Sequence, residues 1–198
     1  SCHTMSAMMQ ASANPAPRSP KRARRITATQ VHGALVMVVE GHGASRSTAE
    51  RRVTEWEVGP SPGYVAALVE VVQARAENEA ATGARLLAAI CLNNVIGRRW
   101  RPRRGNAVDD TEKDAVRSWL LEDAHQESDA RVFAQLELCC RRCAKADWPA
   151  TFRAAPRVYL ASYARGSRTA LVLFGAVVKE LARKGLPRDR RVLKEDAA

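Results

Sequence analysis

Apolar residues recur at helical spacing through most of this chain, and the pattern is clearest over residues 83–100, GARLLAAICLNNVIGRRW. Leu86, Leu87, Ile90, Val95 and the aliphatic residues between them recur at intervals of three and four, which places side chains on one face of an α-helix. One face of this helix is therefore predicted to be buried. The tandem amide Asn93-Asn94 interrupts that face, and because short amides are poor helix formers, the pair is predicted to make a contact.

Similar periodic segments, separated by short polar or Pro/Gly breaks, predict further helices. Ser47, three residues before Glu50, resembles a capping box, so the second helix is expected to begin at Ser45 or Ser47. Asp147 is expected to cap a helix that Trp148-Pro149 begins. The predicted helices are 27–39, 45–57, 64–75, 83–100, 109–122, 129–146, 147–162 and 167–184.

Taken in pairs, these helices predict the architecture. The second members begin near residues 47, 83, 129 and 167, close to the roughly 40-residue period of HEAT-type helix pairs. We therefore expect an all-α fold, an α-α superhelix (a HEAT/armadillo-like solenoid) of about four helix pairs. The alternative is an ordinary globular bundle of about eight helices, which the period alone does not exclude.

Composition agrees with an all-α chain, since only 5% of the residues are aromatic while Ala, Leu, Arg and Glu dominate. The longest apolar run is shorter than the roughly 20 residues of a membrane-spanning helix, and no signal-peptide pattern occurs at the start. An intracellular chain is expected. Because it does not begin with Met, we also expect a fragment of a longer protein.

Cysteine usage favours reduced, buried thiols over a disulfide framework, because the count of five is odd. Cys139, Cys140 and Cys143 share one predicted helix with no His or fourth Cys nearby to complete a zinc site. We expect no metal site.

The net charge of +11 is partly concentrated in residues 1–26, which lack helical periodicity and are predicted to form a disordered basic arm. The run PKRARR has the form of a nuclear-localisation signal, and a solvated disordered arm is the alternative. The region 27–198 is the predicted helical domain.

Catalytic patterns are lacking. The sequence has no Gly-rich phosphate loop, nucleophile elbow or HExxH motif, and the paired carboxylates Asp109-Asp110 fall at a predicted helix start, where the helix dipole favours anions. We expect neither an enzyme nor a bound cofactor.

Four ordered blocks of this sequence resemble the N-terminal region of importin-β-type nuclear transport receptors. AERRVTEWEVGPSPGYVAALVEVVQ and GARLLAAICLNNVIGRRW are similar to the opening segments of the family, and AQLELCCRRCAKADWPATF is similar to its DWP signature. SRTALVLFGAVVKELARKGLPRDRR is most similar to the importin-eleven branch. The resemblance covers residues 27–194, with Trp56, Trp100 and Trp148 as expected anchors between repeats.

This resemblance implies a segment that binds the small GTPase Ran in its GTP form, with second helices on the concave side. It also implies shuttling between nucleus and cytoplasm through the nuclear pore, with cargo and pore proteins contacted by a longer parent chain. Asn94 matches the Asn of the family, whereas Asn93 stands where Lys is usual, so a charge is missing. The implied Ran-binding candidates are Glu50, Arg51, Glu55, Asn93, Asn94, Arg98, Gln135 and Arg142.

A second hypothesis follows from the charge. A basic helical-repeat protein could bind nucleic acid or an acidic protein partner through the arm and the residues Arg98, Arg99, Arg101, Arg103 and Arg104. The last predicted helix is apolar enough to require a neighbour, and we expect an exposed apolar strip there, formed by Ala170, Leu171, Leu173, Phe174, Val177, Val178 and Leu181.

Overall fold

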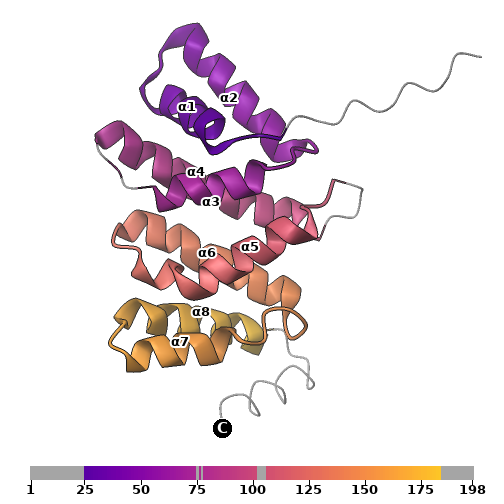
Figure 1. The fold of residues 1–198 in the computed structure, drawn as a ribbon, viewed down its shortest axis with the longest axis vertical. Helices are drawn as coiled ribbons and strands as arrows, with labels where there is room; N and C mark the ends of the chain where they lie inside the picture. Colours follow the sequence, from indigo (N-terminus) through magenta and orange to yellow (C-terminus); the bar gives the residue numbers. More distant parts are fainter. Residues whose placement is uncertain (1–24, 75, 77, 102–105, 184–198) are drawn as a thin grey trace, which may run out of the picture.

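A computed structural model describes residues 25–74, 76, 78–101 and 106–183. In these residues the chain forms eight α-helices and a short 3-10 helix, η1, and contains no strand (Figure 1). The helices are α1 (Ala28–Glu40), α2 (Gly43–Val58), α3 (Tyr64–Gln73), α4 (Glu79–Arg99), α5 (Asp110–Glu122), η1 (Ala124–Gln126), α6 (Ala130–Asp147), α7 (Ala155–Ala164) and α8 (Arg168–Arg183). The predicted all-α fold is confirmed.

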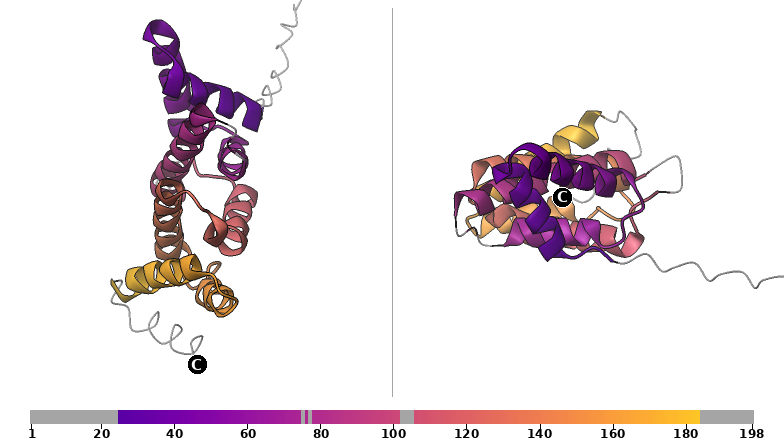
Figure 2. Two further views of the ribbon diagram at one scale, coloured as in Figure 1. Left: turned by 90° about the vertical axis from the view of Figure 1, so that its left-hand side faces the viewer. Right: turned by 90° about the horizontal axis from the view of Figure 1, so that it is seen from above.

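The helices pack in pairs that stack along one axis, as predicted for a HEAT-like array. Helices α4, α6 and α8 pack successively on one another, with α2 at the end of their column, while α3, α5 and α7 form the other column (Figure 2, left). The first pair departs from this regular stacking, because α1 packs on both α3 and α4 while α2 touches α4 only lightly. Despite this difference, the second helices of the pairs, α2, α4, α6 and α8, share one side of the array.

Polar caps set most helix starts. The Thr27 hydroxyl accepts from the Gln30 backbone N–H while the Gln30 side chain accepts from the Thr27 N–H, which is a capping box. The capping box expected at Ser47 and Glu50 was wrong, because the chain is already helical from Gly43. The Ser47 hydroxyl instead donates to the Gly43 carbonyl.

The start of α4 was predicted four residues late. Asn78 caps the helix by accepting from the Ala81 backbone N–H at 2.8 Å, so the polar stretch before Gly83 is its first turn. The start of the seventh helix was also wrong. Asp147 is the last residue of α6, the Trp148-Pro149 peptide is cis, and α7 begins only at Ala155, with Pro156 in its first turn.

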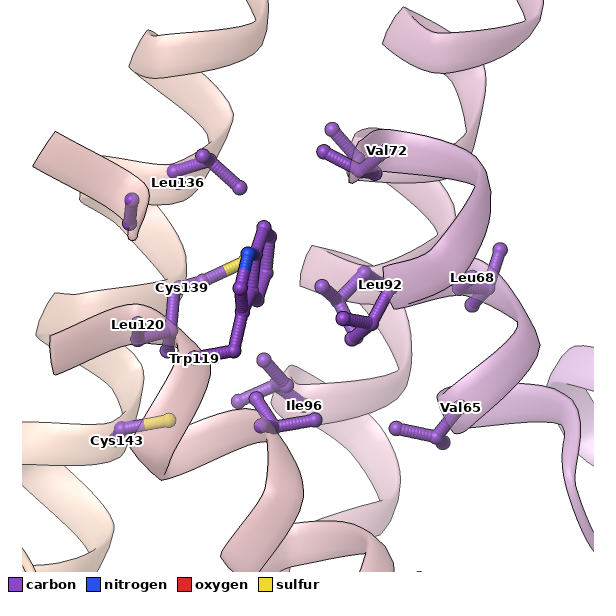
Figure 3. Close-up of a cluster of buried hydrophobic side chains, with 14 of the residues drawn as sticks. Val65, Leu68, Val72, Leu92, Ile96, Trp119, Leu120, Leu136, Cys139 and Cys143 are labelled. Carbon is purple, nitrogen blue, oxygen red and sulfur yellow. The ribbon is translucent and has the colours of Figure 1, made fainter. Parts of the chain in front are cut away.

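The core is continuous between the pairs. Figure 3 shows the junction of the second and third pairs, where Trp119 of α5 lies between side chains of α3 and α4 and those of α6. Trp119 was not among the tryptophans that the sequence singled out, yet it is 7% exposed. The labelled residues are Val65, Leu68, Val72, Leu92, Ile96, Trp119, Leu120, Leu136, Cys139 and Cys143.

The cysteines of α6 belong to this core. Cys139, Cys140 and Cys143 are fully buried and not disulfide-bonded, which confirms the prediction of buried thiols. Burial raises the pKa of the Cys140 thiol to about 12 and also raises the pKa values of Cys139 and Cys143 well above their ordinary range. No three His, Cys, Asp or Glu side chains in the described part of the chain are placed to hold a metal ion.

Among the described helices, α4 is long and apolar enough to cross a membrane by length and composition, although the apolar runs of the sequence were predicted to be too short for this. It packs against α1, α3 and α6 and buries the polar residues Asn93 and Arg99 along with its apolar ones. Burial inside the helical array accounts for its apolar composition.

The expected apolar strip on the last helix is only partly exposed. Ala170, Leu173, Val177 and Leu181 are buried because α8 packs on α6 and α7. Leu171 and Val172 are exposed, and Phe174 and Val178 are half-buried. Residues 1–24 of the predicted arm and the segment after Arg183 lie outside the described residues, whereas Ile26 of the arm packs against the core and donates its N–H to the Pro62 carbonyl.

Candidate functional site

The predicted Asn pair on α4 divides into a buried and a surface residue. Asn93 is 6% exposed, and its amide nitrogen donates to Gln135 Oε1 on α6 at 3.1 Å. The Asn93 Oδ1 atom is buried without a hydrogen-bond partner in the described structure. Asn94 is half-buried and lines a surface hollow. Asn93 therefore acts between helices, and of the two only Asn94 is open to a partner.

Arg142 of α6 lies across α4 at the same level. Its guanidinium donates to the backbone carbonyl of Asn93, and it covers Gly97 so closely that a Cβ at residue 97 would collide with the guanidinium. Glycine at this position allows the arginine to lie against the helix. The contacts Asn93 to Gln135 and Asn93 to Arg142 thus join three predicted residues into one polar bridge between α4 and α6.

The hollow beside this bridge has a volume of about 590 Å³ and lies between the C-terminal halves of α4 and α6. Its lining includes four cationic side chains and no acidic one. Arg98 and Arg142 were predicted as Ran-binding residues and Arg101 as a nucleic-acid contact, whereas Lys145 is an addition. The full lining is Asn94, Ile96, Gly97, Arg98, Trp100, Arg101, Arg142, Lys145 and Ala146.

The predicted residues on α2 are solvent-exposed and paired along the helix. Glu50 accepts from Arg46 at 2.8 Å, and Arg51 lies 4.0 Å from Glu55, with side chains that are 71% and 67% exposed. Such exposed pairs contribute little stability, so these side chains are free to exchange partners.

Two arginines of α4 contact α2. The guanidinium of Arg98 lies 3.6 Å from the carboxylate of Glu57. Arg99 donates to the carbonyl oxygens of Trp56 at 3.1 Å and Asn106 at 2.9 Å. Arg99 is 4% exposed, so its predicted role as a nucleic-acid contact was wrong, because its guanidinium is used inside the fold. Arg103 and Arg104 lie outside the described residues.

The expected anchors differ in what they contact. The Trp100 indole N–H donates to the Asp147 carboxylate at 2.7 Å. Trp148 is also buried, but its indole nitrogen has no partner in the described structure. Trp56 packs on Tyr64, with ring centroids 5.7 Å apart, and carries the Arg52 guanidinium 4.9 Å from its centroid.

Asp147 joins three helices rather than capping α7. Its Oδ2 atom accepts from Trp100 at the end of α4 and from Arg117 of α5 at 2.8 Å, while Arg101 lies 3.8 Å from Oδ1. Arg117, which sequence reasoning missed, is 8% exposed. Arg117 follows several other charged residues on the same helix, so the sequence did not indicate that its side chain would be buried.

Residues 49–138 match the family model of the Importin-beta N-terminal domain. The chain carries an importin-beta N-terminal domain. The matched region runs from α2 into α6 and includes Glu50, Asn93, Asn94, Arg98 and Gln135. No curated protein and no solved structure gives a further match.

The importin-beta N-terminal domain is the Ran-GTP-binding domain of the importin-β nuclear transport receptors. These receptors are non-enzymatic, and they shuttle between nucleus and cytoplasm. The match does not distinguish one branch of the family from another.

Proposed function

We propose that this chain is the N-terminal segment of a nuclear transport receptor for protein import, and that it binds Ran-GTP through the shared side of α2, α4 and α6. The family match over residues 49–138 supports the function, since it covers all of α4 and parts of α2 and α6. The observation that carries the location is the polar bridge from Asn93 to Gln135 and Arg142, which fixes polar groups of two successive second helices on one surface.

The proposed contacts fall into two groups. Glu50, Arg51 and Glu55 on α2 are exposed, and their ion pairs within the described residues are to neighbours on their own helix. Asn94, Arg98, Gln135 and Arg142 on α4 and α6 are exposed or half-buried around the hollow and the bridge. Asn93 is a positioning residue, because its side chain is buried and acts through Gln135.

Surface variants test this location. Arg98→Ala and Arg51→Ala each remove a side chain that is more than half exposed, so the fold should be retained. We expect each to weaken retention of Ran loaded with a GTP analogue, by about tenfold in affinity if one charged hydrogen bond is lost. Arg157→Ala on α7 is the matched control, because Arg157 is exposed on the other column of helices. Equal loss in all three variants would contradict the location.

The domain is proposed to extend beyond the family match, over residues 27–198, because the α7–α8 pair continues the same stack. Within the family, the importin-eleven branch is favoured by the sequence of α8 and the residues after it. Cargo and nuclear-pore proteins would be contacted by a longer parent chain, with localisation to the nucleus, the cytoplasm and the nuclear envelope. Expression of the parent transcript with a fluorescent tag tests this localisation.

A further inference from the structure

The basic hollow between α4 and α6 has an unusual balance of charge. Arg98, Arg101, Arg142 and Lys145 line it together, and its lining contains no carboxylate. Helix dipoles favour cations in the last helical turn, which accounts for Arg98 at the end of α4 and Lys145 at the end of α6. Arg101 and Arg142 lie outside these last turns, so the dipoles do not explain their presence.

The acidic groups that border the hollow are already engaged. Glu57 lies 3.6 Å from Arg98, and Asp147 lies 3.8 Å from Arg101, both longer than a good charged hydrogen bond. Asp147 also accepts from Arg117 and Trp100. Glu180, on α8, pairs with Arg141 at 3.5 Å.

Lys145 is the clearest unmatched charge. It is exposed, and no carboxylate among the described residues lies within ion-pair distance of its ammonium group. No carboxylate of the described residues pairs with Arg142 either, and its guanidinium donates instead to the Asn93 carbonyl. A hollow lined by one sign of charge focuses the field and raises the local concentration of anionic ligands.

We infer that this hollow binds an acidic segment of a protein partner, with Asp or Glu carboxylates placed between Arg98, Arg101, Arg142 and Lys145. Guanidinium groups bind carboxylates through two parallel hydrogen bonds, and three of the four cations are arginines. The half-buried amide of Asn94 adds a neutral donor at the same wall. A volume of about 590 Å³ fits a few side chains of an extended peptide.

Single-stranded nucleic acid fits this hollow less well. Such ligands are held by exposed aromatic rings on which bases stack, together with a basic groove along the backbone. The aromatic residue in the lining, Trp100, is 2% exposed and its indole N–H is already bonded to Asp147. The hollow therefore offers charge without a stacking platform.

This inference does not depend on Ran binding, although Arg98 and Arg142 belong to both surfaces. Arg101 and Lys145 belong to the hollow and not to the proposed Ran contacts, so the double variant Arg101→Ala/Lys145→Ala separates the two. The matched control is Arg157→Ala/Lys179→Ala, which removes the same charges from exposed positions on α7 and α8. Circular dichroism would establish that both variants fold.

The probe is a fluorescent peptide of six consecutive glutamates, titrated with the full chain and followed by fluorescence anisotropy. We expect the hollow variant to weaken binding at least about tenfold and the control variant to change it less than about twofold. A glutamine peptide of the same length should not bind. Equal weakening in both variants would show diffuse attraction to a basic protein and would overturn the proposal.

Two further arms complete the test. The first arm uses a six-residue oligothymidylate. If it binds more tightly than the glutamate peptide and loses binding in the hollow variant, the ligand of the hollow is nucleic acid and not an acidic peptide. Retention of the GTP form of Ran by the hollow variant, measured in parallel, should be unchanged. If the chain binds the peptide through the hollow but does not bind Ran, the proposed function alone is contradicted. If it binds Ran but does not bind the peptide through the hollow, the inference about the hollow alone is contradicted.

Discussion

The indole nitrogen of Trp100 donates a 2.7 Å hydrogen bond to Oδ2 of Asp147, joining the end of α4 to the last residue of α6. Arg117 of α5 shares the same carboxylate oxygen at 2.8 Å, and its guanidinium lies 5.8 Å from the centroid of the Trp100 ring. One buried carboxylate thus holds three helices of two successive pairs together.

Replacing Asp147 should therefore destabilise the fold strongly. Asp147→Ala leaves the Arg117 guanidinium and the Trp100 N–H without their acceptor, and breaking a buried pair in this way costs about 3 to 5 kcal/mol. Urea unfolding followed by circular dichroism measures the change. Asp114→Ala is the control, since Asp114 also contacts Arg117 but its carboxylate is 71% exposed, and its loss should cost less than about 1 kcal/mol. Equal losses would contradict the assigned role of Asp147.

A side chain at residue 97 should displace the guanidinium of Arg142. In Gly97→Ala the new methyl group meets the Arg142 guanidinium, so the arginine must leave the Asn93 carbonyl. We expect weaker binding of Ran-GTP with little change in stability, because the end of a flexible side chain moves cheaply and the lost hydrogen bond offsets the gain of up to about 1 kcal/mol usual for Gly to Ala in a helix.

Gly175→Ala provides the contrast. Gly175 lies within α8, and a Cβ there would meet nothing within 4 Å. This variant should be as stable as the parent chain or more stable, and should bind Ran-GTP unchanged. If both glycine variants behave alike, the contact between Gly97 and Arg142 has no consequence in solution.

Alkaline pH should destabilise the chain through its buried thiols. Burial raises the pKa of Cys140 from its ordinary value of 9.0 to about 12, so between these values the unfolded chain releases a proton that the folded chain retains. The stabilising contribution is complete below pH 9 and is lost as the pH rises toward 12.

By pH 10 this linkage should remove about 1 kcal/mol from the free energy of unfolding for each such thiol. Urea unfolding at pH 7.5 and pH 10 measures the change in the free energy of unfolding between the two pH values, in the parent chain and in Cys140→Ala. Comparing these two changes cancels the loss of packing that the substitution causes at both pH values. The variant should lose about 1 kcal/mol less than the parent between the two pH values. The same loss in both proteins would contradict the assignment.

Local periodicity predicted much of this fold. The helical pattern and the spacing of about 40 residues predicted paired helices in order, because each stripe of apolar residues must be buried against a neighbour. The first residues of the helices were less predictable where a residue that could cap a helix has another role in the fold. Ser47 and Asp147 both had the sequence context of a cap, yet Ser47 lies inside a helix that begins at Gly43, and Asp147 is needed by Trp100 and Arg117.

The candidate site was predictable only in part, because several of its contacts join residues that are far apart in the sequence. The positions of Asn94 and Arg98 on α4 follow from helical spacing within one segment. The burial of Asn93 and Arg99 depends on Gln135 and on the carbonyl of Trp56, which are more than 40 residues away in the sequence. The basic hollow required α4 and α6 to be placed side by side, which brings Arg101 and Lys145 to the same surface.

The central claim is that the chain recognises the nucleotide state of Ran. The most direct measurement is a calorimetric titration of the purified 198-residue chain with Ran bound to a non-hydrolysable GTP analogue and, separately, to GDP. The account predicts saturable binding to the GTP form with an affinity at least about tenfold higher than for the GDP form, a difference of about 1.4 kcal/mol. Equal affinity for the two forms, or no binding to either, would contradict it.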